Sequence, residues 1–234
     1  MSQPKKTPAP KKAPPKRPAP PRSKTADTPA AEHPFRHATF LLSAPEPRHL
    51  PPDLGAEIAF AGRSNAGKSS ALNVLCDQVG LARTSKTPGR TQSLVVFQID
   101  ENRRLIDLPG YGYAKVPEAV RAQWRGSIDR YLRERVSLRG AVLIMDSRHP
   151  MKEFDQLMLG YCRDVNLPCH ILLTKSDKLS RGEAARTLQQ LRKDLAAEGF
   201  IATAQLFSSL QKTGVDEARQ KLSELLDAPP AAVE

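Results

Sequence analysis

A glycine-rich segment holds the residues best suited to bind phosphate. It fits the pattern GxxxxGK[ST] and reads Gly62-Arg63-Ser64-Asn65-Ala66-Gly67-Lys68-Ser69, with Ser70 after it. The glycines allow backbone N–H groups to turn inward around a phosphate, and the N-terminus of a following helix adds positive potential. Lys68 would reach the terminal phosphates, and the Ser69 hydroxyl would ligate Mg2+. The alternative is an ordinary turn, but an apolar strand before it and a helical pattern after it favour a phosphate-binding loop.

A second motif on the phosphate side is DxxG, at Asp107-Leu108-Pro109-Gly110. The Asp107 carboxylate can hold Mg2+ through a water molecule, and the Gly110 N–H can sense a γ-phosphate. By itself, an aspartate before Pro-Gly is most often a turn. Because it follows a phosphate loop and a strand hairpin, we expect it to belong to the same site.

Two further strand ends carry residues suited to read a base. Thr174-Lys175-Ser176-Asp177 follows one apolar run, and Phe207-Ser208-Ser209 ends the next. The Asp177 carboxylate can accept two hydrogen bonds from guanine, whereas adenine presents no such pair of donors. The alternative is that Ser176 and Asp177 merely cap a helix. Four motifs in order, each at a strand end, predict a guanine nucleotide site.

Short apolar runs alternate with segments of helical period from residue 35 onward, which predicts an α/β fold. Apolar residues recur every three or four positions within 120–132, 154–161, 188–195 and 215–226. Runs without polar alternation indicate a mostly parallel sheet with helices on both faces. The expected six strands are Glu57 to Ala61, Leu94 to Ile99, Arg103 to Leu108, Ala141 to Met145, His170 to Leu173 and Gln205 to Phe207. Too few residues join the second and third for a crossover, so these two pair antiparallel and form one edge of the sheet.

The first 34 residues differ in composition from the rest of the chain. They contain ten prolines and eight Lys or Arg against two acidic residues, within a chain of net charge +11. We expect residues 1–34 to be a disordered basic tail, 35–228 a GTPase domain and 229–234 a short flexible end. The tail would either contact RNA phosphates or be solvated without a partner.

Composition also limits the compartment and the other kinds of site. Because no apolar run is long enough to span a bilayer and the start lacks a secretory pattern, we expect a cytoplasmic protein without a membrane partner. The three cysteines form no CxxC pair, and the five histidines show no metal-ligand spacing. Neither a disulfide framework nor a transition-metal site is predicted.

The sequence resembles the EngB (YihA/YsxC) family of translation-factor-related GTPases, bacterial proteins of ribosome assembly, from about residue 36 to residue 226. The segments that carry the resemblance are Gly62 to Ser70, Lys86-Thr87-Pro88-Gly89-Arg90-Thr91-Gln92, Asp107-Leu108-Pro109-Gly110-Tyr111-Gly112-Tyr113-Ala114, Asp146-Ser147-Arg148-His149-Pro150, Thr174-Lys175-Ser176-Asp177 and Ser43-Ala44-Pro45. Threonine at position 174, where most GTPases have asparagine, is usual in that family.

The resemblance implies roles that composition does not settle. Thr84, Thr87 and Thr91 all lie in a Thr/Ser/Pro/Gly-rich loop, and composition does not choose between them. The family pattern implies that Thr91 is the switch threonine that contacts Mg2+ and the γ-phosphate, with Gly89, Arg90 and Gln92 beside the nucleotide. The residues expected to act in hydrolysis are then Lys68, Thr91 and Gly110, and the metal ligands are Ser69, Thr91 and, through water, Asp107.

Two further implications concern the rate of hydrolysis. Tyr111 follows Gly110 where many GTPases carry a water-positioning glutamine, so we expect slow intrinsic hydrolysis. Asn65 matches a residue that ligates K+ in potassium-activated relatives, although asparagine also serves there as a turn former.

The resemblance implies GTP and GDP as ligands with Mg2+, and the large ribosomal subunit or its rRNA as partner. Arg121, Arg125, Arg130, Arg133 and Arg135 could contact RNA phosphates, or could form a solvated face. The alternative function is a switch read by a protein partner in cell division, since the family is also linked to septation. A nucleotide kinase fits poorly because no arginine-rich lid follows the phosphate loop. We expect a monomer and no DNA partner.

Overall fold

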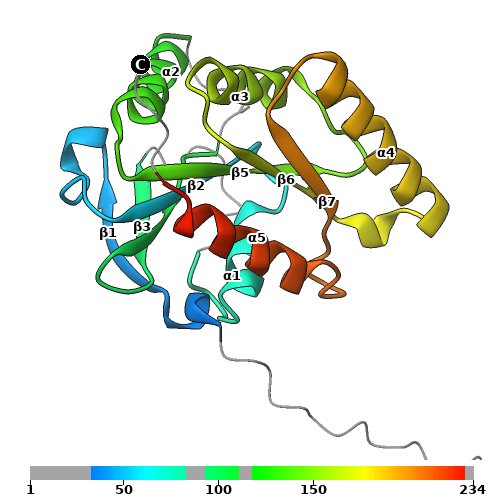
Figure 1. The fold of residues 1–234 in the computed structure, drawn as a ribbon, viewed down its shortest axis with the longest axis horizontal. Helices are drawn as coiled ribbons and strands as arrows, with labels where there is room; N and C mark the ends of the chain where they lie inside the picture. The colour runs from blue at the N-terminus through cyan, green and yellow to red at the C-terminus, as the bar shows by residue number, and fades with distance from the viewer. Residues whose placement is uncertain (1–32, 83–92, 111–117, 230–234) are drawn as a thin grey trace, which may run out of the picture. The chain divides into compact units, whose positions relative to one another are not determined.

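A mostly parallel sheet forms the centre of the molecule (Figure 1). The computed structural model describes residues 33–82, 93–110 and 118–229. In these residues seven strands lie in the order β1-β3-β4-β2-β5-β6-β7. The strands are β1 (Thr39–Ala44), β2 (Ala56–Gly62), β3 (Leu94–Gln98), β4 (Arg103–Asp107), β5 (Leu138–Asp146), β6 (Cys169–Thr174) and β7 (Ala202–Leu206). Only β3 pairs antiparallel, with β1 and β4 on either side of it. The predicted α/β class is confirmed.

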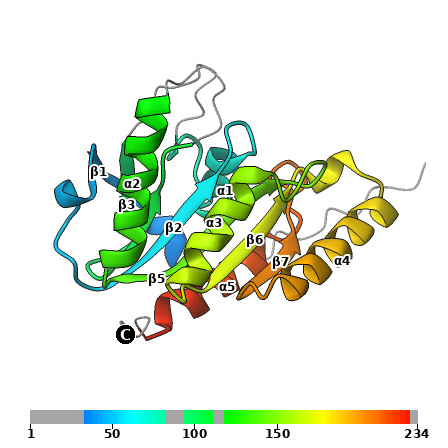
Figure 2. The same ribbon diagram turned by 90° about the horizontal axis from the view of Figure 1, so that it is seen from above.

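Helices cover both faces of this sheet (Figures 1 and 2). They are η1 (Pro34–His37), η2 (Pro47–His49), α1 (Lys68–Leu75), α2 (Glu118–Glu134), α3 (Glu153–Asp164), η3 (Ser176–Lys178), α4 (Arg181–Ala197) and α5 (Val215–Asp227). Buried side chains of α2, α3 and α4 share one hydrophobic cluster, and those of α1, α5 and η1 share another. Strand β2 contributes to both clusters and is buried at every position, as expected for a strand covered on both faces.

One strand was missed by the sequence analysis. The predicted hairpin of β3 and β4 is present, but β1 pairs along the outer side of β3 and takes the edge position. Strand β1 is mostly exposed, with Phe40 and Leu41 among the exposed large apolar residues. A run that is neither buried nor alternating gives no periodic signal in the sequence. The place of β1 is set instead by its pairing with β3, which begins 50 residues after β1 ends.

Local side-chain chemistry explains two of the connections. The Asp100 carboxylate accepts hydrogen bonds from the backbone N–H of Asn102 and of Arg103, which closes the turn between β3 and β4. Helix α4 begins with a capping box, in which Ser180 accepts from the Glu183 N–H and Glu183 accepts from the Ser180 N–H. In both cases the residues that form the hydrogen bonds lie within one short stretch of the sequence.

The carboxyl ends of β2, β4, β5, β6 and β7 meet at one edge of the sheet, because these five strands run parallel. Each is followed by a loop that carries one of the polar motifs. At the first of these ends, a Cβ on Gly62 would lie 2.9 Å from the Ile144 Cβ. Glycine is therefore required where β2 passes β5 into the loop.

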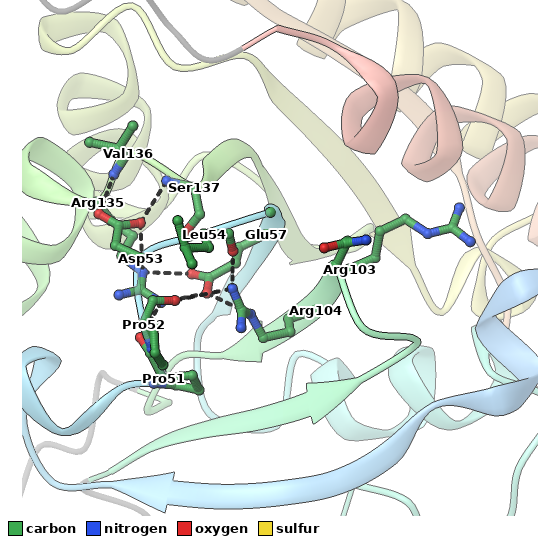
Figure 3. A network of polar contacts seen from close by, with 12 residues as sticks. Pro51, Pro52, Asp53, Leu54, Glu57, Arg103, Arg104, Arg135, Val136 and Ser137 are labelled. Carbon is green, nitrogen blue, oxygen red and sulfur yellow. Dashed lines mark hydrogen bonds and ion pairs between the residues drawn. The ribbon is translucent and has the colours of Figure 1, made fainter.

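A buried ionic network lies at the opposite, amino end of β2 (Figure 3). Glu57 is completely buried, and its carboxylate binds Arg104 Nε at 3.0 Å and Arg135 Nη2 at 2.7 Å. Arg135 also donates to the Pro51 carbonyl at 2.9 Å, and the adjacent Asp53 accepts from the Ser137 N–H at 2.7 Å. The network joins β2, β4 and the end of α2 to the segment after η2.

This network removes Arg135 from the arginines considered for RNA contacts. Its side chain is only 10% exposed and is engaged by Glu57. Arg130 and Arg133 are exposed and pair along α2 with Glu134 and Asp129, while the side chains at positions 121 and 125 lie outside the described part of the molecule.

Within the described ranges, no helix has the length and apolarity needed to cross a bilayer.

The predicted boundaries at residues 34 and 229 stay predictions, because residues 1–32 and 230–234 are not described. The described chain near the first boundary begins with η1, whose Phe35 is completely buried beside α1 and α5. Phe35 therefore packs in the core on the face of the sheet that α1 and α5 cover.

Candidate nucleotide-binding site

The glycine-rich segment forms a loop between β2 and α1, the context that a phosphate-binding loop requires. Two of its residues have positive φ: Asn65 at 61° and Gly67 at 102°. Gly67 is the N-cap of α1, so Lys68, Ser69 and Ser70 form the first turn of the helix, where backbone N–H groups are free of intrahelical partners. Asparagine tolerates the left-handed region better than most residues, and this alone accounts for Asn65 as a turn former.

Lys68 and Asp107 bring the first two motifs together. The Lys68 ammonium forms an ion pair with the Asp107 carboxylate, and both side chains are almost completely buried. Burial raises the pKa of Asp107, while Lys68 opposes that rise. A Cβ on Gly110 would lie 3.9 Å from the Gly62 carbonyl oxygen, so the glycine of DxxG lies beside the start of the loop. Leu108 and Pro109 are buried, and Leu108 belongs to the hydrophobic core.

The third motif contacts the phosphate loop directly. The Thr174 hydroxyl lies 2.5 Å from the Ala66 carbonyl oxygen and 3.0 Å from that of Met145. Lys175 has a φ of 57° and donates from Nζ to the Asn65 carbonyl at 2.6 Å. The predicted phosphate and base motifs are thus held side by side, although about 110 residues separate them in the chain.

The end of β7 supports the base motif. The Ser208 hydroxyl donates to Asp177 Oδ1 at 2.6 Å, and this hydrogen bond lowers the pKa of Asp177. The Ser176 hydroxyl donates to the Phe207 carbonyl at 3.0 Å, while the Phe207 ring is completely buried in the core. Ser209 follows at the partly exposed rim. The Ser208 hydroxyl therefore orients the Asp177 carboxylate and favours its ionised form.

The available donors fit Mg2+. Of the predicted ligands, the structure describes Ser69, through its hydroxyl, and Asp107, whose carboxylate would act through water. Mg2+ prefers oxygen ligands and retains several waters. Among the described residues, no group of three or more His, Cys, Asp or Glu side chains could hold a metal ion.

Part of the predicted site lies outside the described residues. Gly89, Arg90, Thr91 and Gln92 fall within 83–92, and Tyr111 falls within 111–117. Their roles as switch and nucleotide contacts stay predictions.

The structure adds contacts to which the sequence analysis gave no role. Asp146, at the end of β5, accepts from Lys175 Nζ at 2.9 Å and from Arg148 Nη2 at 2.7 Å. The Arg63 side chain reaches the start of α3, where it lies near His149 and the buried Asp155. The available signal was an aspartate directly after the fourth expected strand, within the segment Asp146 to Pro150 already quoted for its resemblance.

Comparison with known proteins gives a consistent result. A model of a 50S ribosome-binding GTPase family matches residues 57–175. A probable GTP-binding protein EngB of Stenotrophomonas maltophilia is 57% identical over 183 residues, covering 78% of this chain and 92% of its own. A protein of the same description from Coxiella burnetii is 52% identical over 196 residues, covering 84% and 96%. The crystal structure of a probable GTP-binding protein engB has the same fold, with a TM-score of 0.59 at 20% identity, over 73% of this chain and 98% of that one.

Proposed function

The chain belongs to the EngB family of GTP-binding proteins and is a GTPase, and from this we propose that it acts as a GTP-driven switch in assembly of the large ribosomal subunit. The observation that carries the proposal is the match of a 50S ribosome-binding GTPase family over residues 57–175, which include the phosphate loop, the DxxG motif and the start of the base motif. The basic charge of the chain, +11, supports a partner rich in phosphate. A ribosomal partner implies that the protein works in the cytoplasm.

In this proposal different residues bind different parts of GTP and its metal ion. The phosphate loop and Lys68 hold the phosphates, and Asp177, in the motif that begins at Thr174, holds the guanine. Ser69, Thr91 and, through water, Asp107 would hold Mg2+, which neutralises phosphate charge when bound. Thr91 and Gly110 would respond to the γ-phosphate. Tyr111 in place of glutamine supports slow intrinsic hydrolysis. We propose that K+ bound at Asn65 accelerates GTP hydrolysis, and hydrolysis rates in K+ compared with Na+ would test this.

Guanine specificity should depend on Asp177. Asp177→Asn should weaken GTP binding by about tenfold or more and shift preference toward xanthosine triphosphate, because the amide presents a donor where guanine also donates. Dissociation constants for GTP, xanthosine triphosphate and ATP would measure this. Asp164→Asn, at an exposed ion pair of α3, makes the same chemical change away from the site and serves as the control. Equal binding of ATP and GTP by the unmutated protein would contradict the assignment.

Ribosome association should depend on the nucleotide. We expect the full chain to sediment with large ribosomal subunits more strongly under a non-hydrolysable GTP analogue than under GDP, because the switch conformation depends on the γ-phosphate. The measurement is cosedimentation at increasing salt.

A variant lacking residues 1–34 tests the part played by the predicted tail. It should bind GTP as before but show a shallower salt dependence, since fewer counterions are released. The division of roles is wrong if the variant loses GTP affinity or keeps the full salt slope. A chain that stays in the supernatant in every nucleotide state would instead favour a protein partner in cell division.

A further inference from the structure

The stretch from the last residue of β5 to the first turn of α3, residues 146–155, contacts both halves of the candidate site. It begins with Asp146-Ser147-Arg148-His149-Pro150, which has no assigned role in the proposed function. It lies at the carboxyl edge of the sheet, between the phosphate loop that follows β2 and the base motif that follows β6. We call residues 146–155 the bracing segment.

On the base side, the bracing segment fixes Lys175. Asp146 Oδ2 accepts from Lys175 Nζ at 2.9 Å, and the Ser147 N–H donates to the Thr174 carbonyl at 2.9 Å. Asp146 is itself held by Arg148, whose N–H, Nε and Nη2 donate to its two oxygens at 3.1, 2.9 and 2.7 Å. Burial would raise the pKa of Asp146, but the hydrogen bonds from Arg148 and Lys175 outweigh it and hold the pKa well below its usual range.

On the phosphate side, the bracing segment holds Arg63. Arg63 Nη2 donates to the His149 carbonyl at 3.0 Å, and Arg63 Nε lies 3.5 Å from Asp155 Oδ2. Asp155 is completely buried, and the same oxygen accepts from the Lys152 N–H at 3.0 Å. The Arg63 guanidinium is therefore directed to α3, and it ties the second residue of the phosphate loop to a fixed acidic anchor.

These contacts have a common geometric result. Lys175 Nζ bonds at once to Asp146 and to the Asn65 carbonyl, so the phosphate loop, the base motif and the bracing segment meet at one ammonium group. An ammonium on a four-carbon side chain has many rotamers, and two fixed acceptors select one of them. Holding the side chain in one rotamer lowers the ordering cost of nucleotide binding.

We propose that Asp146 and Arg63 are positioning residues for the guanine nucleotide, with Asp146 acting through Lys175 and Arg63 through the phosphate loop. The proposal rests on the nucleotide site proposed above. Because both act on groups beside the base and the loop backbone, and neither belongs to the motifs expected to respond to the γ-phosphate, GDP and GTP should be affected alike. This distinguishes them from Thr91 and Gly110, whose loss should affect GTP more than GDP.

Dissociation of a fluorescent GDP or GTP analogue from the full chain tests the role of Asp146. Asp146→Ala should release both nucleotides about tenfold faster, since a charged hydrogen-bond partner of Lys175 is lost. Lys175→Ala should also release them faster, and the double variant should match Lys175→Ala alone, because Asp146 acts through that lysine. A structural defect elsewhere would add to the effect of Lys175→Ala instead.

Two further variants keep the test interpretable. Asp146→Asn retains the shape and one acceptor, so it should give a smaller acceleration even if Asp146→Ala fails to fold. Asp164→Asn should leave release unchanged, because Asp164 is exposed and pairs only with its neighbour Arg163 among the described contacts. Release at the wild-type rate from folded Asp146→Asn and Asp146→Ala, or additive effects in the double variant, would overturn the inference.

The result separates this inference from the nucleotide site itself. If the wild type binds GDP and Lys68→Ala binds it more weakly, while the Asp146 variants behave as wild type, only the positioning role fails. If the unmutated chain binds no guanine nucleotide, both fail.

Discussion

Lys68→Ala should lower GTP affinity about 10- to 100-fold and GTP hydrolysis by about a hundredfold or more. Lys68 is the cation of the glycine-rich loop whose side chain contacts the DxxG motif, through its ion pair with Asp107. Alanine leaves the terminal phosphates without that charge and leaves Asp107 buried without its partner. Isothermal titration with GDP and GTP and single-turnover hydrolysis measure the two losses.

Ser69→Ala is the informative comparison for this variant, since Ser69 follows directly in the same helical turn. Its affinity loss should vanish when Mg2+ is withheld, whereas the loss in Lys68→Ala should remain. Circular dichroism of each nucleotide-free variant controls for folding. Wild-type affinity in folded Lys68→Ala would mean that the glycine-rich segment is an ordinary turn.

Glu57→Ala should lower the free energy of unfolding by about 3–5 kcal/mol, because it leaves Arg104 buried without its counterion and leaves Arg135 with the weaker ion pair to Asp53, at 3.4 Å. Both arginine side chains are 10% exposed and each binds the Glu57 carboxylate at 3.0 Å or less. The effect should appear in urea denaturation of the nucleotide-free chain. Stability within about 0.5 kcal/mol of the wild type would contradict this account of the network.

Two controls separate charge from position in that experiment. Glu57→Gln keeps the shape and one acceptor and should cost less than alanine. Glu101→Ala removes an exposed acid from the turn between β3 and β4 and should have little effect. Because Glu57 lies at the amino end of β2, away from the site, folded Glu57→Gln should retain its GDP affinity.

The sequence by itself determined the features whose cause is local. The phosphate loop was predictable because strand, glycines, lysine and helix follow one another without a gap, and the backbone conformations at Asn65 and Gly67 depend on those residue types. The hairpin of β3 and β4 was predictable for the same reason, since the chain between them is too short for a crossover. Continuous apolar runs such as β2 indicated a buried parallel sheet, and the parallel order then placed the motif-bearing strand ends at one edge.

Only the tertiary structure decided the features that depend on partners far along the chain. The edge position of β1 depends on β3, and the burial of Arg135 depends on Glu57, 78 residues away. The polar contacts of Arg63 with His149 and of Lys175 with Asn65 span 86 and 110 residues. An arginine or aspartate has the same side chain whether it faces solvent, phosphate or a buried counterion. Its role is therefore set by the groups that folding brings within hydrogen-bonding distance, and residue type and spacing do not contain that information.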